Sequence, residues 1–450
     1  MGLRNVLTKN VLLPLGEVFS GLSISTKLKF LEESQWWSHA KLEAYQNMKL
    51  QELVKHAYRN TAYYKEKFDE LGLKPLDIRS RDDLHKLPIL KKEEIRENVK
   101  NGRLIANNIH SKNLILNSSS GSTGEPLKYY ETKESHAFNK ACIMRGWQWM
   151  GYHLGDKYVK ISQFDRSLIK RIQDKLNNSV YLSAQIITDE NLSKIVDGIN
   201  SSKPTVIRSY PDQLKALISY LKKNDIEIYS PSAITTTGSV LHFNDRRLVE
   251  GVFNCEVFDQ YSCEGGAITF ECATHECYHS SMEYAITEII NDNKRHAEPG
   301  EEGRVITTDL QNYATPFIRY DTQDILKRSE QDCTCGRKLL SIEKIKGRDS
   351  DILITPIGQK LISHEFSIYF QKVKSIEQFQ VIQKNHDSLL FSFKTSKQLS
   401  QNEKNDIQNY WTNYVENSMS ILIEEVESIP LNPSGKRRYV IRDKSIKLTL

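Results

Sequence analysis

The chain has 450 residues, 39% of them apolar and 26% charged, a composition typical of a folded protein with a sizeable core. Its 62 basic and 57 acidic residues are mixed along the whole length, so the formal charge of +5 forms no arm or stripe suited to a nucleic-acid duplex. We therefore expect no nucleic-acid partner. A basic rim around an anionic small molecule would use the same excess of charge.

The cysteines and the N-terminal segment indicate in which cellular compartment the protein is expected. Seven cysteines is an odd number, and four of them form the close pairs Cys272/Cys277 and Cys333/Cys335, a spacing that suits a metal better than the disulfides of a secreted protein. The apolar runs within residues 1–30 are interrupted by proline, glycine, glutamate and serine, and they fall short of a membrane span. We predict a cytoplasmic protein without a transmembrane segment. A weak peripheral membrane contact through this segment is the alternative.

The first elements along the chain are predicted to be helices. Within residues 32–72, Leu50, Leu53 and Val54 recur at helical spacing, and Gly72 closes the run. These apolar residues are expected to face a core.

From Leu114 onward, short β-branched runs alternate with helical stretches. The runs expected to be strands are LILN, YVKI, PTVIRS, AITTTG and CEVFDQY, with helices through Ala141 and Leu221 between them. This alternation is typical of parallel sheets with crossover helices. The chain is therefore predicted to be an α/β protein with parallel-rich sheets, preceded by a helical region over about residues 1–100.

The character of the sequence changes after Gly347. HEFSIYFQKV and NEKNDIQNYWTNYV are predicted to be helices, and IEQFQVIQ and SLLFSFKT to be strands around a turn at Asn385-His386-Asp387. A unit of this size can fold as a small α+β domain. We expect a large N-terminal domain over residues 1–346 and a small, mobile C-terminal lid over residues 347–450.

The most informative segment, SSSGSTGEP, follows the strand LILN and spans residues 118–126. Its two glycines allow the backbone to turn so that successive N–H groups converge on one anion, and its hydroxyls add donors to phosphate oxygens. The segment lacks the GK[ST] ending of P-loop NTPases, so it is not that motif. A flexible polar turn is the alternative.

Further segments follow this loop in a fixed order. The set consists of SSSGSTGEP (118–126), YSCEGG (261–266), RYDTQD (319–324), GRDSD (347–351) and PSGKRR (433–438). Together they resemble the successive core motifs of the adenylate-forming acyl-CoA synthetase superfamily. Within it, the chain is most similar to the phenylacetate-CoA ligase-like branch, which includes the CapK-like proteins of capsular polysaccharide assembly. Supporting segments are KLQELVKHAYRNTAYYKEKF (49–68), DDLHKLPILKKEEIRE (82–97) and CTCGR (333–337), and the resemblance covers roughly residues 10–445.

The resemblance implies which residues bind ATP and AMP. The nucleotide-binding residues expected on this basis are Ser119, Ser120, Gly121, Ser122, Thr123, Gly124, Gly238, Ser239, Tyr261, Asp324 and Arg348. The first six would form the phosphate loop, and Gly238 and Ser239 would line the nucleotide with backbone. Tyr261 would pack near the adenine, Asp324 would accept from the ribose hydroxyls, and Arg348 would stabilise the nucleotide near the hinge.

Two residues are expected to act at the reacting atoms. Attack of a carboxylate on the α-phosphorus of ATP crowds negative charge, which preplaced cations and donors must meet. By resemblance, Glu264 is the glutamate associated with Mg²⁺, and Lys436 is a mobile lysine that reaches the α-phosphate and the acid oxygen. A solvated surface position is the ordinary alternative for either residue.

The chain departs from the superfamily at three positions. The superfamily usually has Arg-Tyr-Arg-Thr-Gly-Asp where this chain has Asp321 in the third place and Gln323 in the fifth, so a cation and a flexible glycine are missing beside Asp324. Ser350 replaces the first of the acids that the hinge often pairs. We expect altered nucleotide geometry, while the domain rotation of the superfamily stays allowed.

Two of the cysteine-containing segments could share one metal ion. Cys272, His279, Cys333 and Cys335 supply three thiolates and an imidazole, a set that suits tetrahedral zinc, and the branch resemblance favours this choice. A site closed by four protein ligands would be structural. His275 and Cys277 are further donors in the same loop, and free buried cysteines are the alternative.

We therefore predict an adenylate-forming ligase that joins an aromatic or acyl carboxylic acid to AMP and transfers the acyl group to coenzyme A. A second interpretation is an adenylyltransferase or amide-forming ligase of capsular or surface polysaccharide biosynthesis. A third is a catalytically inactive nucleotide-binding protein, which Asp321 and Gln323 favour weakly and Glu264 and Lys436 oppose. The partners expected are a small-molecule acid and its acceptor. The sequence leaves the identity of both, and the oligomeric state, open.

Overall fold

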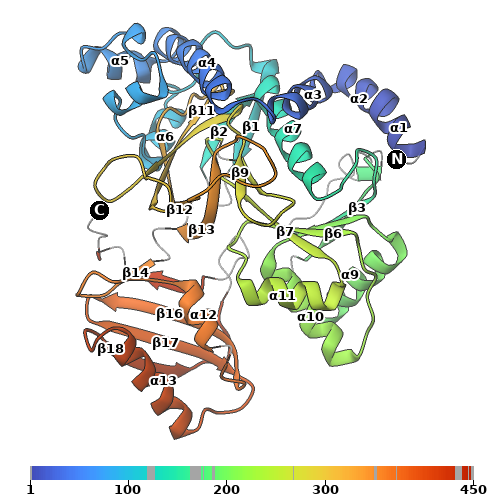
Figure 1. The fold of residues 1–450 in the computed structure, drawn as a ribbon, viewed down its shortest axis with the longest axis vertical. Coiled ribbons are helices and arrows are strands. Elements are labelled where there is room, and N and C mark those ends of the chain that lie inside the picture. The colour runs from blue at the N-terminus through green and yellow to red at the C-terminus, as the bar shows by residue number, and fades with distance from the viewer. Residues whose placement is uncertain are drawn as a thin grey trace.

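The computed structural model describes residues 3–118, 127–162, 174–175, 177–184, 188–266, 268–348, 352–370, 372–430, 438–443 and 445–446 (Figure 1). Helices occupy the N-terminal part of the chain, as the sequence predicts. They are α1 (Leu3–Leu7), α2 (Leu13–Ser20), α3 (Ile24–Ser34), α4 (His39–Asn60), α5 (Ala62–Glu70) and α6 (Lys92–Lys100).

The long helical run predicted over residues 32–72 is interrupted at Thr61. Leu50 and Leu53 are fully buried, so the predicted apolar face of α4 does form part of a core. Thr61 ends α4 and begins α5, because its hydroxyl accepts a hydrogen bond from the backbone N–H of Tyr64 at 3.2 Å. The break turns one amphipathic stretch into two packed helices.

A two-stranded hairpin and one long helix follow. Strand β1 (Leu114–Ser118) pairs antiparallel with β2 (Lys128–Thr132), and α7 (Lys133–Trp149) leaves the end of β2. The Thr132 hydroxyl accepts from the N–H of Ser135, which fixes the start of α7.

The parallel part of the main sheet lies between two layers of helices (Figure 1). Strands β3 (Tyr158–Ser162), β4 (Ser179–Ser183), β5 (Val206–Ser209), β6 (Ala233–Thr237) and β7 (Glu256–Ser262) run parallel in the order β4-β3-β5-β6-β7. Ile207, Ile234 and Val257 point to one face, where they share a core with α9 (Asp189–Ser202), α10 (Pro211–Asn224) and α11 (Phe243–Phe253). Val206 and Phe258 point to the other face, towards α7.

The remainder of the main sheet is antiparallel, which the predicted alternation did not reveal. Beyond β7 the sheet continues in the order β8-β9-β13-β12-β11-β10, giving eleven strands in the described part of the chain. These strands are β8 (Ile268–Glu271), β9 (Tyr278–Ser280), β10 (Ala285–Ile290), β11 (Glu302–Asp309), β12 (Tyr320–Arg328) and β13 (Ser341–Arg348).

The C-terminal unit contains the helices and strands that its sequence predicts. Its elements are β14 (Ile352–Ile354), β15 (Lys360–Ile362), α12 (Ser363–Phe370), β16 (Ile376–Asn385), β17 (Ser388–Thr395), α13 (Gln401–Tyr414), β18 (Ser420–Glu425) and β19 (Val440–Arg442). Phe366 stacks on Trp411 in its core, and Phe370 packs against the same indole at a tilt. The predicted α/β fold class is confirmed. The division after residue 346 stays a prediction, and Gly347 and Arg348 still pair with β12.

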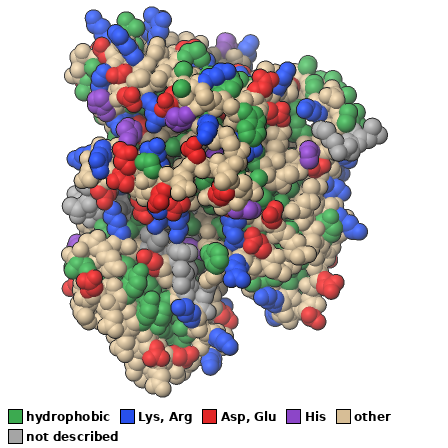
Figure 2. Space-filling model, in the orientation of Figure 1, with side chains coloured by type: hydrophobic (Ala, Val, Ile, Leu, Met, Phe, Trp, Pro, Cys, Tyr) green, Lys and Arg blue, Asp and Glu red, His purple; other side chains and the backbone are tan. Residues whose placement is uncertain are grey.

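The surface and the N-terminal segment agree with the charge pattern of the sequence. On the face seen in Figure 2, basic and acidic side chains are interspersed. Among the described residues, no helix combines the length and the apolar character that crossing a membrane requires. Val18 and Phe19 of α2 are 80% and 89% exposed, and the peripheral membrane contact stays a prediction.

An ion pair sealed from water holds α7 in place. Arg145 Nη1 lies 2.7 Å from Oε1 of Glu283, and the two side chains are 1% and 0% exposed. The Ser34 hydroxyl of α3 donates to the same oxygen at 2.6 Å, and Arg145 Nη2 donates to the Ser281 hydroxyl at 3.0 Å. The pair therefore joins α3, α7 and the segment between β9 and β10.

We predict that Arg145→Met lowers the free energy of unfolding by about 3–5 kcal/mol, because the Glu283 carboxylate would stay buried without its counter-ion. Urea denaturation followed by tryptophan fluorescence measures the loss. Lys194→Met is the control, since Lys194 and Glu190 form a pair that is 68% and 80% exposed. Equal midpoints for the two variants would contradict a stabilising role for the buried pair.

Candidate functional site

Tyr261 and Asp324 are joined by a hydrogen bond, although their strands are not neighbours. The Tyr261 hydroxyl donates to Oδ2 of Asp324 at 2.7 Å. Tyr261 lies in β7 and Asp324 in β12, and β8, β9 and β13 lie between these strands in the sheet. The sheet must therefore curl for the side chains to meet. Burial raises the pKa of Tyr261 well above its ordinary value, so the phenol stays a donor at physiological pH.

The turn after β7 holds Glu264 close to the antiparallel strands. Gly265 and Gly266 have φ angles of +86° and +98°, a region that favours glycine. A Cβ on Gly265 would lie 2.8 Å from the Tyr320 ring, and the Gly265 carbonyl accepts from the Thr307 hydroxyl at 3.0 Å. Close contact with β11 and β12 thus fixes the backbone beside Glu264.

Glu264 also lies near the end of the predicted phosphate loop. Burial, together with the charges of Glu131 and Glu264, raises the pKa of Tyr129 well above its ordinary value. Tyr129 belongs to β2, the strand that follows the loop. Burial and the charge of Glu264 likewise raise the pKa of Tyr320. The carboxylate therefore acts on phenols from β2 and from β12.

Several predicted site residues lie outside the described residues. These are the phosphate-loop residues Ser119, Ser120, Gly121, Ser122, Thr123 and Gly124, the lysine Lys436 and the hinge residue Ser350. Ser118 pairs with Lys128, so β1 and β2 mark the two ends of the loop. The described part of Arg348 is its backbone, which is paired with Asp324.

The predicted Gly238-Ser239 turn lies beside the hinge end of β13. Gly238 follows β6 and has a φ angle of +85°. A Cβ on Gly347 would lie 3.4 Å from Val240, the residue that follows the turn. The structure therefore brings the backbone around Gly238 close to the strand that ends in Arg348.

The two departures in the RYDTQD segment act together. Gln323 has a φ angle of +63°, the left-handed conformation that a glycine adopts easily. Oδ1 of Asp321 accepts from the N–H of Gln323 at 2.9 Å, and Oδ2 accepts from Nη1 of Arg304 at 3.0 Å. The Asp321 side chain supports the strained turn that leads to Asp324. The sequence alone predicts altered nucleotide geometry from Asp321 and Gln323. It does not reveal the hydrogen bond by which Asp321 supports the backbone of Gln323.

Tyr439, three residues after Lys436, attaches the C-terminal unit to the large domain. Its hydroxyl donates to Oδ1 of Asp212 at 2.7 Å and accepts from Nζ of Lys215 at 3.2 Å. Lys215 also pairs with Asp245 at 3.1 Å. These contacts reach α10 and α11 from the residue that precedes β19. No motif in the sequence marked Tyr439, because a single aromatic residue beside a short strand usually belongs to a core.

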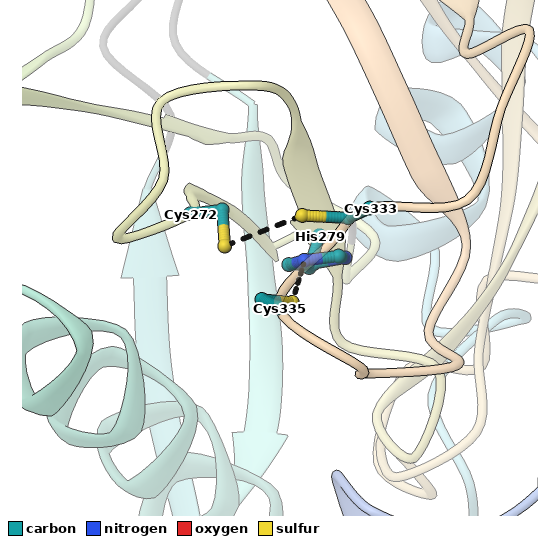
Figure 3. Close-up of side chains that lie close together, drawn as sticks. All are labelled: Cys272, His279, Cys333 and Cys335. Atoms are coloured by element: carbon teal, nitrogen blue, oxygen red, sulfur yellow. Dashed lines mark hydrogen bonds between the residues drawn. The ribbon is translucent and has the colours of Figure 1, made fainter.

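The four predicted zinc ligands lie together (Figure 3). The donor atoms of Cys272, His279, Cys333 and Cys335 are all within 4.8 Å of one another. The sulfurs of Cys272 and Cys333 are 3.6 Å apart, and Nε2 of His279 is 3.2 Å from the sulfur of Cys335. Tetrahedral zinc with bonds of about 2.3 Å separates its ligand atoms by about 3.8 Å, so the cluster is close to the size that zinc requires.

The protonation of these groups also fits a metal. Burial, with the charges of Arg337 and Arg145, lowers the pKa of His279 to about 4, so its imidazole is neutral at pH 7 and able to coordinate. Burial raises the pKa of Cys272 and of Cys333 to about 11, so these thiols would release their protons on binding a metal.

The two further donors in this loop have different surroundings. Nδ1 of His275 lies 3.0 Å from Oε1 of Glu271, and the imidazole stacks on Phe258, with the ring centroids 4.5 Å apart. The Cys277 sulfur lies 3.7 Å from Nε2 of His279 and belongs to the same buried cluster. His275 is therefore committed elsewhere, whereas Cys277 is a fifth donor beside the four.

Comparisons with known proteins agree with the motifs. A family model described as the CapK C-terminal domain matches residues 353–443. Protein CapK of Staphylococcus aureus is 23% identical over 450 residues, with 95% of this chain and 97% of that protein covered. The phenylacetate-coenzyme A ligase of Thermus thermophilus is 24% identical over 328 residues, which cover 70% of this chain and 72% of the ligase.

Solved structures of adenylate-forming ligases share the fold. The 2-hydroxyisobutyryl-CoA ligase in its postadenylation state matches with a TM-score of 0.74 at 15% identity, over 92% of this chain and 93% of the ligase. The amide bond synthetase McbA from Marinactinospora thermotolerans matches with a TM-score of 0.54 at 13% identity, over 73% of this chain and 68% of that protein. The resemblance predicted from the ordered motifs is confirmed.

We propose that the Cys272, His279, Cys333 and Cys335 cluster binds one zinc ion per chain and stabilises the loops around it. Cys335→Ser should reduce the bound zinc and lower the midpoint of thermal unfolding, because binding at the site and local folding are coupled. Elemental analysis and calorimetry measure the two effects. Cys255→Ser is the control, because Cys255 lies outside the cluster. Well under one equivalent of zinc in freshly reduced protein would rule the proposal out.

Proposed function

We propose that this chain, an adenylate-forming ligase of the phenylacetate-CoA ligase-like type, activates a carboxylic acid as its acyl-AMP and transfers the acyl group to coenzyme A. The contact that carries the proposal is the hydrogen bond between Tyr261 and Asp324 beside the Glu264 turn. It brings two distant motifs to one place, near the strands that border the predicted phosphate loop. The similarity to phenylacetate-CoA ligases supports the same chemistry.

The reaction begins with a substitution at phosphorus. A carboxylate oxygen of the acid forms a bond to the α-phosphorus of ATP, and the bond to the pyrophosphate oxygen breaks. The loop over residues 119–124 would bind the phosphates through backbone N–H groups and hydroxyls. Lys436 would neutralise charge on the α-phosphate and the attacking oxygen. Fixed donors and cations of this kind stabilise the transition state without having to reorganise.

The residues around Asp324 would position the nucleoside. The Tyr261 hydroxyl holds one carboxylate oxygen of Asp324, which fixes the orientation in which this side chain would accept from ribose hydroxyls. The Gly238-Ser239 turn would contact the nucleotide through its backbone. Arg348, paired in the backbone with Asp324, would act from the hinge side.

Glu264 would hold Mg²⁺ beside the phosphates. Its carboxylate is partly buried, and Tyr129 and Tyr320 lie within reach of its charge. A carboxylate oxygen is a ligand type that Mg²⁺ prefers, and the ion usually completes its shell with phosphates and water. Bound there, Mg²⁺ would offset phosphate charge. The protein's own part is to keep Glu264 in place through the Gly265-Gly266 turn.

A second candidate has a different acceptor. CapK similarity extends over 95% of the chain, and the CapK C-terminal model matches residues 353–443, which favours a role in surface-polysaccharide biosynthesis. An amine or a sugar would then take the acyl or adenylyl group. An acid-dependent pyrophosphate-release screen, run with and without coenzyme A, separates the two functions. A catalytically inactive protein would release no pyrophosphate with any acid.

We predict that Glu264→Gln slows acid-dependent pyrophosphate release by about 10²-fold, because a charged contact to the metal–phosphate group would be lost from the transition state. The thermal midpoint should change much less. Glu256→Gln, at the start of the strand β7 that leads to the Glu264 turn, is the control, since the Glu256 side chain is 71% exposed. Wild-type activity in Glu264→Gln would refute the assignment of Glu264.

We predict that Lys436→Ala affects one half-reaction selectively. The variant should release pyrophosphate at least about 10²-fold more slowly, because a positioned charge is lost from the first transition state. Chemically supplied acyl-AMP should still react with the acceptor at nearly the wild-type rate, since the lid must move before the acceptor approaches. Single-turnover assays of the two half-reactions measure the difference.

Arg437→Ala and Arg438→Ala are the neighbouring controls for Lys436→Ala. A general loss of basic charge would slow all three variants alike. Equal losses in both half-reactions of Lys436→Ala, or a loss in neither, would exclude a mechanism in which the lid takes two positions.

A further inference from the structure

The face of the parallel sheet that packs towards α7 changes from apolar to polar along the strands. Val206, Ala233 and Phe258 share a hydrophobic core with α7. Side chains alternate between the two faces of a strand, so Arg208 and Gln260 point to the same side as these apolar residues. They lie towards the carboxyl ends of β5 and β7.

Among the residues that the structure describes, none supplies a carboxylate counter-ion to Arg208 on this face. Its Nε is buried and has no hydrogen-bond partner, and no described carboxylate pairs with its guanidinium. Burial lowers the pKa of Arg208, while the neighbouring phenols of Tyr210 and Tyr158 raise it. Lys160 of β3 is paired in register with Arg208, so two positive residues stand side by side on one face. Such an arrangement is complementary to an anion.

Gln260 is a buried amide whose two polar atoms find no hydrogen-bond partner in the described part of the chain. The residue is 2% exposed, and both its Oε1 and its Nε2 lack a hydrogen-bond partner. Leaving both ends of an amide unpaired in the protein interior opposes folding, so such a group calls for a ligand or ordered water. Thr237, its register partner on β6, is 6% exposed and adds a hydroxyl on the same face.

These side chains adjoin the proposed nucleotide site. Gln260 directly precedes Tyr261, and Thr237 directly precedes Gly238. Ligands of open parallel sheets bind at the carboxyl ends of the strands, where these residues lie. Arg208 is two strands away from Gln260, about 10 Å across the sheet, a separation that a small organic acid can span.

We propose that Arg208 and Gln260 select an acid substrate that carries a second carboxylate, which they bind at the end opposite to the reacting carboxylate. The proposal rests on the proposed function and adds the class of substrate, a dicarboxylic acid. The planar guanidinium can donate two parallel hydrogen bonds to a carboxylate, and the Gln260 amide can donate a third. A purely aliphatic or aromatic acid would leave the buried Nε of Arg208 and the amide of Gln260 unpaired.

The test measures acid selectivity. Dicarboxylic acids of four to eight carbons and the matched monocarboxylic acids are compared by pyrophosphate release with wild type, Arg208→Leu, Arg208→Lys and Gln260→Leu. Wild type should prefer a dicarboxylic acid. Arg208→Leu should lower kcat/KM for that acid by about 30- to 100-fold, with the KM for ATP unchanged, because a charge-assisted hydrogen bond is lost. Arg208→Lys should recover part of the loss, and Gln260→Leu should shift preference towards monocarboxylic acids.

Arg247→Leu is the matched control. Arg247 is exposed on α11, which covers the opposite face of the sheet, so its loss should leave selectivity unchanged. Wild-type preference for monocarboxylic acids, or selectivity unaffected in Arg208→Leu and Gln260→Leu, would overturn the proposal and leave adenylation intact.

Titration calorimetry with the dicarboxylic acids separates this proposal from the proposed function. Binding that Arg208→Leu abolishes, without pyrophosphate release from any acid, would support the pocket and refute the ligase. Unchanged binding in Arg208→Leu would refute the pocket and leave water as the partner of Arg208 and Gln260. Absence of both binding and pyrophosphate release would refute both proposals.

Discussion

The candidate site depends on the curvature of the main sheet, which is evident from the hydrogen bond between Tyr261 and Asp324. Neighbouring strands lie about 4.8 Å apart, so a flat sheet would separate β7 from β12 by about 19 Å. A contact of 2.7 Å requires the sheet to curl until its parallel and antiparallel parts face one another. The Gly265-Gly266 turn makes this approach sterically feasible, because any Cβ at Gly265 would meet the Tyr320 ring. The curl therefore brings the segments that carry Tyr261, Glu264 and Asp324 together.

The sequence predicted those parts of the fold that local pattern determines. The buried face of α4 and the helices and strands of the C-terminal unit follow from apolar periodicity. The order β8-β9-β13-β12-β11-β10 does not follow, because pairing between distant strands depends on tertiary contacts that periodicity does not record. For the same reason, Tyr439 was missed. Its partners Asp212 and Lys215 lie more than 200 residues earlier in the chain.

For the candidate site, the motifs identified individual residues, but the contacts between those residues became visible only in the structure. The ordered motifs led to Tyr261, Glu264 and Asp324, which the structure places near one another. Considered separately, Asp321 and Gln323 predict altered nucleotide geometry and weakly favour an inactive protein. In the structure, Asp321 accepts from the N–H of Gln323 and so supports the left-handed turn that a glycine would otherwise supply. Two departures from a motif can thus preserve the backbone that the motif encodes, and pairwise compensation of this kind is visible only in three dimensions.

An adenylating enzyme must bind both a nucleotide and an acid. In the curled sheet, the residues that we assign to these two ligands lie on different strands. The antiparallel strands carry Asp324 and support the Glu264 turn, whereas the parallel strands carry Arg208 and Gln260 on their α7 side. In the proposed function the first group serves the nucleotide, and the second group serves the acid. The inner face of the parallel strands can change without disturbing Tyr261 or Asp324, because alternate residues of a strand point to opposite faces. The buried Nε of Arg208 and the buried amide of Gln260 are polar groups that the packing of this face does not require, which is why we assign them to the proposed acid substrate.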